Sequence, residues 1–142
     1  MISHEAAAGN LAPGAMRVRD TAIDSDSNAE AEACINLTTA RTYRLEASFR
    51  ALVADTCILG WDEFLGPDCT RPNGVFVASD AIVVNANSYS ALATQQTANE
   101  LAQSIELVLL CSIGAGEAEF LVDDVAVLPQ TVLVFRNGFE SP

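Results

Sequence analysis

The side chains of this sequence that could bind a ligand are mainly carboxylates, and the first group of them lies in a polar segment. Asp24, Asp26 and Asn28 alternate along it, followed by Glu30 and Glu32. Because Ca²⁺ prefers several oxygen ligands at short range, this spacing predicts a calcium site. The segment is not an EF-hand loop, since its sixth position is alanine and its twelfth is isoleucine. A solvated acidic loop would explain the same residues without a metal.

Two adjacent carboxylate pairs raise the question of catalysis. Hydrolysis of a glycosidic bond needs an acid and a base held apart across the sugar, and Asp62–Glu63 and Asp123–Asp124 are the pairs in question. Adjacent residues of a strand point to opposite faces, so neither pair can supply both groups alone. Carboxylates from distant strands could converge, which the sequence does not show. The single histidine, His4, lies near the terminus without a nucleophile as its partner. We therefore predict that the protein is not an enzyme.

The elements that would position these residues are strands. Residues 29–37 and 43–51 both alternate between apolar and polar side chains, and a polar turn at 38–42 separates them. Period-two alternation is typical of half-buried strands, so we predict a central hairpin that needs a second layer to cover it. Further strands are predicted at 14–19, 56–64, 75–84 with an interruption at Ser79–Asp80, 88–94, 119–128 and 131–135.

Residues 97–111 allow two interpretations. Thr97 and Glu100 form a capping-box pattern, and the apolar residues that follow have helical spacing. The later residues alternate and suit a buried strand. We expect at most a helical turn at 98–102 and a strand from about Gln103. Many short strands with turn signals predict an all-β fold, a two-sheet antiparallel β-sandwich or jelly roll.

Composition restricts the class of protein. At 142 residues the chain is one domain with terminal segments, here divided into an irregular segment 1–13, a sandwich 14–128 and a tail 129–142. The net charge of −12 makes nucleic acid a poor partner. No apolar run reaches the roughly 18 residues of a membrane span. The first ten residues lack the regions of a signal peptide, which is compatible with Met1 being an added start on an excised segment.

Four cysteines allow three disulfide connectivities, and side parity favours one of them. Cys57 shares its strand face with apolar residues, and so does Cys111, which predicts an internal Cys57–Cys111 bridge. Cys34 shares its face with acidic residues, and Cys69 lies in a loop, which predicts a surface Cys34–Cys69 bridge. The alternative is that one or both pairs stay reduced. Disulfides in a small acidic β-rich chain indicate an exported protein.

A family resemblance covers residues 14–128. The segments that carry it are Gly14-Ala-Met-Arg-Val, Ala33-Cys34-Ile-Asn-Leu, Tyr43-Arg-Leu-Glu-Ala, Ser104-Ile-Glu-Leu and Phe120-Leu-Val-Asp-Asp-Val125. In this order they resemble the galactose-binding-like jelly roll of bacterial carbohydrate-binding modules. The opening strand of that family is not evident before Gly14. We hypothesise that residues 131–135, which precede Asn137-Gly-Phe-Glu140, take its place, either in this chain or in a neighbouring one.

The resemblance implies where ligands would bind. Such modules often hold structural Ca²⁺ near the closing strand, which makes Asp123 a metal candidate with Glu140 as its distant partner. They also stack sugars on exposed aromatic rings. Trp61 and Tyr43 alternate with apolar residues and are predicted to lie in the core. Tyr89, between two serines, is the aromatic residue we expect to be exposed, although the family often packs an aromatic there.

The sequence and the resemblance together imply a secreted or cell-surface, non-catalytic module. It would bind a polysaccharide or cell-surface glycan, or position a neighbouring domain of a larger protein. The alternative is a structural or adhesive β-sandwich of a cell-surface protein that binds no sugar. Flat polar surfaces would favour the alternative, whereas exposed aromatic rings beside a groove would favour glycan binding.

Overall fold

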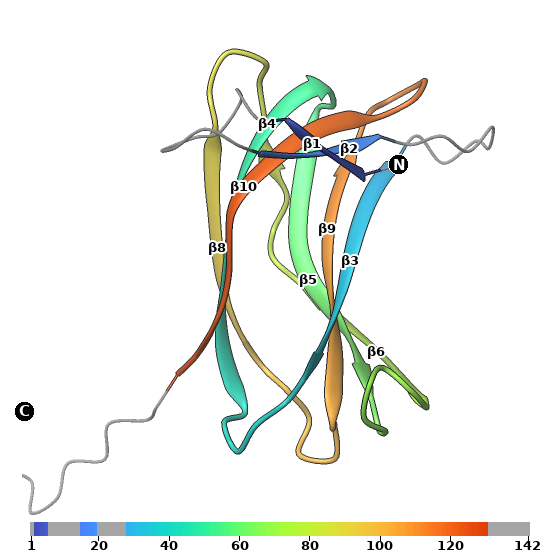
Figure 1. Cartoon of the computed structure of the whole chain (residues 1–142). Helices are drawn as coiled ribbons and strands as arrows, with labels where there is room; N and C mark the ends of the chain where they lie inside the picture. Colours follow the sequence, from blue (N-terminus) through green and yellow to red (C-terminus); the bar gives the residue numbers. More distant parts are fainter. Residues whose placement is uncertain (1, 6–14, 20–27, 131–142) are drawn as a thin grey trace, which may run out of the picture.

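The computed structural model describes residues 2–5, 15–19 and 28–130, and these form ten strands arranged in two layers (Figure 1). The strand pairs within both layers are antiparallel. The predicted all-β sandwich of two antiparallel sheets is therefore confirmed. Within the described ranges we find no helix long and apolar enough to cross a bilayer.

Sheet A has the spatial strand order β1-β2-β10-β4-β8. The bounds of these strands are Ile2–Glu5 for β1, Ala15–Arg19 for β2, Glu119–Pro129 for β10, Thr42–Val53 for β4 and Ser90–Thr97 for β8. Sheet B has the order β3-β9-β5-β6, and a short β7 also pairs with β5. Its strands are β3 (Asn28–Asn36), β9 (Ser104–Ser112), β5 (Thr56–Phe64), β6 (Pro72–Ala78) and β7 (Ile82–Val83).

The predicted central hairpin is wrong, although both of its strands exist. β3 pairs with β9 in sheet B, whereas β4 pairs with β10 and β8 in sheet A. The turn at 38–42 therefore carries the chain from one layer to the other. Alternation specifies which face of a strand is buried, and two facing layers satisfy this requirement as well as one paired sheet does.

Some of the other segments agree with the prediction, and others differ from it. Residues 75–84 do break at Ser79–Asp80, which separates β6 from β7. Residues 98–102 form no more than the single turn that was expected, closed by a hydrogen bond from the N–H of Ala102 to the carbonyl of Asn99 at 2.9 Å. Arg41 donates to the carbonyl of Ala102 at 2.6 Å. Residues 2–5, predicted to be irregular, form β1 beside β2. The predicted strand at 131–135 lies outside the described residues.

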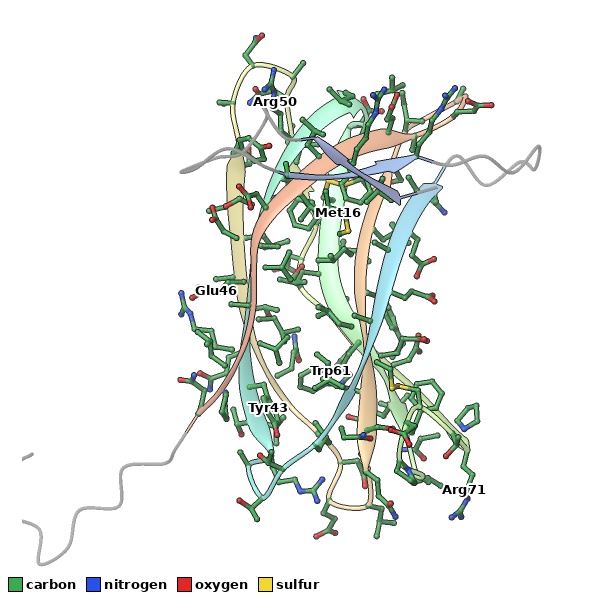
Figure 2. All side chains as sticks on the ribbon, in the orientation of Figure 1. Met16, Tyr43, Glu46, Arg50, Trp61 and Arg71 are labelled. Atoms are coloured by element: carbon green, nitrogen blue, oxygen red, sulfur yellow. A yellow bond between two sulfur atoms is a disulfide. The ribbon has the colours of Figure 1, made fainter. Side chains whose placement is uncertain are left out.

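The core lies between the sheets and contains the inward-facing aromatic residues. Tyr43 and Trp61 meet edge to face across the layers, with ring centroids 6.2 Å apart. Phe49 and Phe120 lie side by side within sheet A at 5.8 Å. Figure 2 shows Tyr43 and Trp61 between the two sheets. Because Trp61 is fully buried and Tyr43 nearly so, the prediction that both belong to the core is confirmed.

One carboxylate is buried at the end of β5. Glu63 is 2% exposed and faces inward beside Trp61. Its Oε1 atom accepts hydrogen bonds from Trp61 Nε1 at 3.3 Å and from the backbone N–H of Asn99 at 3.1 Å. Its Oε2 atom accepts a longer hydrogen bond from Asn73 Nδ2 at 3.5 Å. These donors offset part of the cost of burying a carboxylate and connect β5 to the turn at 98–102.

Both disulfides join the cysteines that side parity pairs. Cys57 and Cys111 are directly opposite each other on β5 and β9 and are buried, with Cα atoms 4.1 Å apart. Cys34 projects from the outer face of β3 and bonds Cys69, with Cα atoms 5.9 Å apart. The second disulfide attaches the loop at 65–71 to the edge of sheet B. Asn36 adds two hydrogen bonds to Asp68 in the same loop, at 2.7 and 2.8 Å.

Candidate functional site

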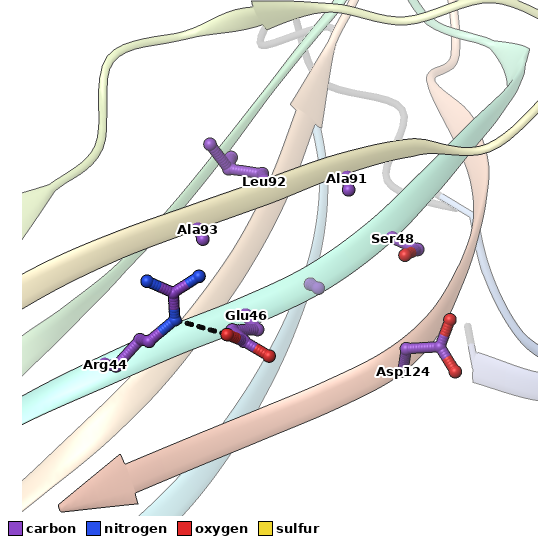
Figure 3. A pocket seen from close by; sticks show the side chains of 8 residues that line it. Arg44, Glu46, Ser48, Ala91, Leu92, Ala93 and Asp124 are labelled. Atoms are coloured by element: carbon purple, nitrogen blue, oxygen red, sulfur yellow. Dashed lines mark hydrogen bonds and ion pairs between the residues drawn. The ribbon is translucent and has the colours of Figure 1, made fainter.

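The outer face of sheet A contains a groove of about 250 Å³. It lies over β4 and its two neighbours, β8 and β10 (Figure 3). We call it the sheet A groove. Its lining residues are Arg44, Glu46, Ala47 and Ser48 from β4, Ala91, Leu92 and Ala93 from β8, and Asp124 from β10. It is open to solvent, because Ala91, Ala93 and Asp124 are exposed.

Side chains alternate between the two faces of β4 and of β8. The outward side chains of β4 form a polar wall of the groove, and two alanine side chains of β8 form its floor. Arg44, Glu46 and Ser48 point outward because their neighbours Tyr43, Leu45, Ala47 and Phe49 fill the core. The guanidinium of Arg44 forms an ion pair with the carboxylate of Glu46 on the same strand. Across the strand pair lie Ala91 and Ala93, opposite Ser48 and Glu46. Their short side chains leave space above the sheet.

Asp124 of β10 lines the groove because β10 contains a β-bulge. Asp123 pairs with Ser48, and the next paired residue, Ala126, lies opposite Glu46. Two residues of β10, Asp124 and Val125, therefore face the single residue Ala47 of β4. The sequence-based rule that adjacent carboxylates point to opposite faces fails here, because the bulge adds a residue to the strand. At Asp62–Glu63 the strand is regular in this respect, since Glu63 is buried and Asp62 is not.

Two predicted ligand residues lie near each other on this face. Tyr89, half-buried, directly precedes β8, and Asp123 lies two strands away on β10. Burial raises the pKa of the Tyr89 hydroxyl, and the negative charges of Asp123 and Asp124 raise it further, against the opposing effect of Arg50. The four side chains are thus close enough to interact electrostatically. The sequence singled out Tyr89 and Asp123 separately, and the fold brings them to the same sheet.

The calcium prediction is not tested. Asp24 and Asp26 lie outside the described residues, as does Glu140. Asn28 begins β3 in sheet B, where it pairs with Ser112, so it lies in the other layer from Asp123. Within the part of the chain that the structure describes, no three residues of the types His, Cys, Asp or Glu are grouped so as to hold a metal ion. Calcium binding stays a prediction.

Sequence reasoning missed the outer face of sheet B. Phe76 of β6 is 48% exposed there and pairs with Asp62, which in turn lies opposite Glu106. With Glu30 and Glu32 these carboxylates form what we call the acidic face of sheet B. Burial raises the pKa of Glu30 and of Glu106, and neighbouring carboxylates add to both shifts. Strand alternation could have placed each residue outward, but only strand order and register bring them together.

Comparison with known proteins finds similarity in structure alone. No family model matches the sequence, and no curated protein matches it. Among solved structures, the N-terminal CBM22-1–GH10 modules of Clostridium thermocellum endo-1,4-beta-D-xylanase 10B, complexed with xylohexaose, match with a TM-score of 0.74 at 15% identity. That match covers 92% of this chain and 25% of the xylanase chain.

Two isolated modules match over most of their own length. A family 16 carbohydrate-binding module gives a TM-score of 0.60 at 16% identity, over 89% of this chain and 84% of that one. TmCBM61, solved with β-1,4-galactotriose, gives 0.61 at 11% identity, over 92% and 88%. This chain has the fold of a carbohydrate-binding module. The resemblance drawn from the sequence is confirmed for the carbohydrate-binding-module fold, and at these identities the comparison concerns the fold alone.

Proposed function

We propose that this protein is a non-catalytic carbohydrate-binding module of a secreted protein and that the sheet A groove binds the glycan. The observation that carries the proposal is the groove itself, a polar, solvent-open channel on one face of a carbohydrate-binding-module fold. Carboxylate, guanidinium and hydroxyl groups line it, and these are the groups that exchange hydrogen bonds with sugar hydroxyls. The short side chains of Ala91 and Ala93 let one face of a sugar ring approach the sheet.

The size of the groove supports an extended ligand over a small enclosed one. Its volume of about 250 Å³ lies below the roughly 300–1,000 Å³ of pockets that enclose a small molecule. A polymer that lies across several strands would occupy it with one part of its length. The open lining argues against catalysis, because stabilising a transition state electrostatically works best where water is excluded.

Two further features support the proposed setting. The chain has two disulfides, and disulfides persist mainly in oxidising compartments outside the cytosol. The xylanase match is to a module joined to a catalytic module, and this chain spans about a quarter of that protein. We infer that this chain likewise holds a neighbouring domain near a polysaccharide.

A structural or adhesive module without sugar affinity is the second candidate. The observation in its favour concerns aromatic side chains, because Trp61 and Tyr43 are buried and cannot stack on a sugar. Tyr89 is half-buried, and Phe76 is exposed on the other sheet. On this interpretation the outer faces would contact protein partners and the sheet A groove would stay empty.

A groove-filling substitution separates the two candidates. Ala91→Arg places a long side chain in the sheet A groove, and we expect it to reduce glycan affinity at least tenfold. Ala81→Arg makes the same change at an exposed position between β6 and β7, on the sheet B side, and serves as the matched control. Xylohexaose, β-1,4-galactotriose and a glycan array would be titrated with each protein, with Ca²⁺ and with a chelator.

The outcomes distinguish the proposals. Binding by the wild type and by Ala81→Arg, with loss in Ala91→Arg, supports the groove as the glycan site. Equal binding by all three proteins would place the sugar elsewhere. No binding by the wild type to any glycan would favour the structural module. A chelator that weakens binding would support the calcium prediction.

A further inference from the structure

The bulge in β10 places Asp124 in an uncommon backbone conformation. Its φ angle is 52°, in the left-handed region that favours glycine. One common kind of β-bulge has glycine at the residue that adopts this conformation. Aspartate tolerates the region better than most residues but at a greater cost than glycine. Local folding alone would therefore be served at least as well by glycine, which would contribute no side chain to the groove.

The bulge also decides where the Asp124 carboxylate points. In a regular strand, the residue after outward-facing Asp123 would point into the core. Here Asp124 is exposed and lines the sheet A groove, opposite the wall formed by Arg44 and Glu46 (Figure 3). Its backbone N–H donates a hydrogen bond to Asp123 Oδ1 at 2.8 Å, which fixes the two residues relative to each other.

The charges at and beside the groove favour a ligand that donates hydrogen bonds and carries no negative charge. Glu46, Asp123 and Asp124 contribute three carboxylates, and Arg44 and Arg50 contribute two guanidinium groups. Arg44 is engaged by Glu46, and Arg50 donates to the carbonyl of Ala86 at 2.8 Å. A carboxylate accepts hydrogen bonds from hydroxyl groups, and such charge-assisted bonds are stronger than neutral ones. Carboxylate or sulfate groups on a glycan would meet like charge.

We propose that Asp124 is the specificity-determining residue of the sheet A groove, where it accepts hydrogen bonds from the hydroxyls of a neutral glycan and disfavours uronic-acid glycans. This inference rests on the proposed function, since it names the ligand class of the same groove. The β-bulge directs the Asp124 side chain into the groove, and it requires the left-handed backbone conformation of Asp124.

Two substitutions at this position test the proposal. Asp124→Asn keeps the shape and the tolerance of the left-handed region but removes the charge. Asp124→Gly removes the side chain and suits the backbone. Asp80→Asn is the charge-matched control, because Asp80 is exposed in the loop between β6 and β7. Each protein would be titrated with xylohexaose, with β-1,4-galactotriose and with the counterpart of galactotriose in which every C6 is a carboxylate.

We expect both Asp124 variants to bind the neutral probe about tenfold to hundredfold more weakly than the wild type. We also expect the ratio of neutral to uronic-acid affinity to fall at least fivefold in Asp124→Asn, while Asp80→Asn keeps the wild-type values. A thermal melt checks the fold, and Asp124→Gly should melt no lower than Asp124→Asn. Variants that bind within twofold of the wild type with an unchanged ratio would overturn the proposal. A wild type that binds none of the probes would instead count against the proposed function.

Discussion

Glu63 is the one carboxylate that is buried among the described residues, and its role is structural. Three donors from β5, β6 and the turn after β8 converge on its two oxygen atoms. It therefore joins elements that are distant in sequence at the end of the sandwich where Trp61 and Tyr43 pack. A residue of this kind limits local opening, because its loss leaves buried donors without an acceptor.

We expect Glu63→Ala to lower the free energy of unfolding by about 1–3 kcal/mol, since the indole N–H of Trp61 and the N–H of Asn99 lose their acceptor. Glu63→Gln keeps one oxygen acceptor and should cost less. Urea unfolding measures both, read as a shift of the midpoint at constant slope. A loss below 0.5 kcal/mol for Glu63→Ala, on the order of a neutral surface change, would show that water replaces the carboxylate.

The sequence predicts the location of some residues in the fold and not of others. Trp61 could be assigned to the core because its apolar neighbours recur at every second position. Cys57 and Cys111 could be paired for the same reason, since both face inward. Asp124 could not be assigned, because a bulge is a property of two strands in register and one strand contains no sign of its partner. The groove was missed as a unit for that reason.

The acidic face of sheet B shows how strand pairing sets electrostatics. Asp62 and Glu106 are directly opposite each other, and Glu30 and Glu32 lie on the neighbouring β3. Like charges in this arrangement destabilise a sheet. Burial and these neighbours raise the pKa of Glu30 and Glu106 above their ordinary value of 4.5. The folded protein therefore holds protons at a pH where the unfolded chain has released them.

The sign of the pH effect follows directly. Where the native state binds more protons than the unfolded state, stability falls as pH rises. We expect the stabilisation from these two groups to be complete below about pH 4.5 and to be lost as pH rises through their raised pKa values. Because the chain has 19 Asp and Glu residues, the effect is measured as a difference between the wild type and a variant.

Glu106→Gln isolates that difference. It removes one charge opposite Asp62, and we expect it to increase the free energy of unfolding at pH 7 by about 0.2–1 kcal/mol. The gain should shrink toward pH 4, where the wild-type carboxyl is protonated. Glu100→Gln, at an exposed turn position, is the control for net charge. Denaturant melts at several pH values would contradict this explanation if both variants gave the same pH-independent change.

Strands were easier to predict than their partners. Alternation located β3, β4, β5 and β10 within a few residues, because the sequence of each strand alone contains the pattern of buried and exposed side chains. The hairpin prediction failed because β3 and β4 have their buried faces toward each other across the core, which alternation alone also permits. Residues 2–5 are too few to show an alternating pattern, so the sequence did not predict a strand there. They form a strand through backbone pairing with β2.

Two disulfides that close loops of different length stabilise the whole molecule. Cys57–Cys111 closes 54 residues inside sheet B, and Cys34–Cys69 closes 35 residues at its edge. Each link restricts the unfolded chain and contributes about 2–4 kcal/mol on that account. The net charge of −12 acts in the opposite direction, because it repels itself in any compact state.

We expect replacement of both Cys34 and Cys69 by serine to lower the free energy of unfolding by about 2–4 kcal/mol. The exposed edge should tolerate the serines, so the fold itself should persist with an unchanged far-ultraviolet spectrum. Guanidinium melts of the variant and of the oxidised wild type give the difference. If the wild type treated with a reductant melts with the untreated protein, the links are either absent or without effect on stability.

β10 is the last strand in the part of the chain that the structure describes, yet it lies between β2 and β4 in sheet A. During translation the ribosome therefore makes the other nine described strands before the one that joins the two parts of this sheet. A nascent chain that ends before residue 119 lacks the strand that pairs with both β2 and β4, so it cannot complete sheet A. Completion of folding is in this way tied to completion of synthesis.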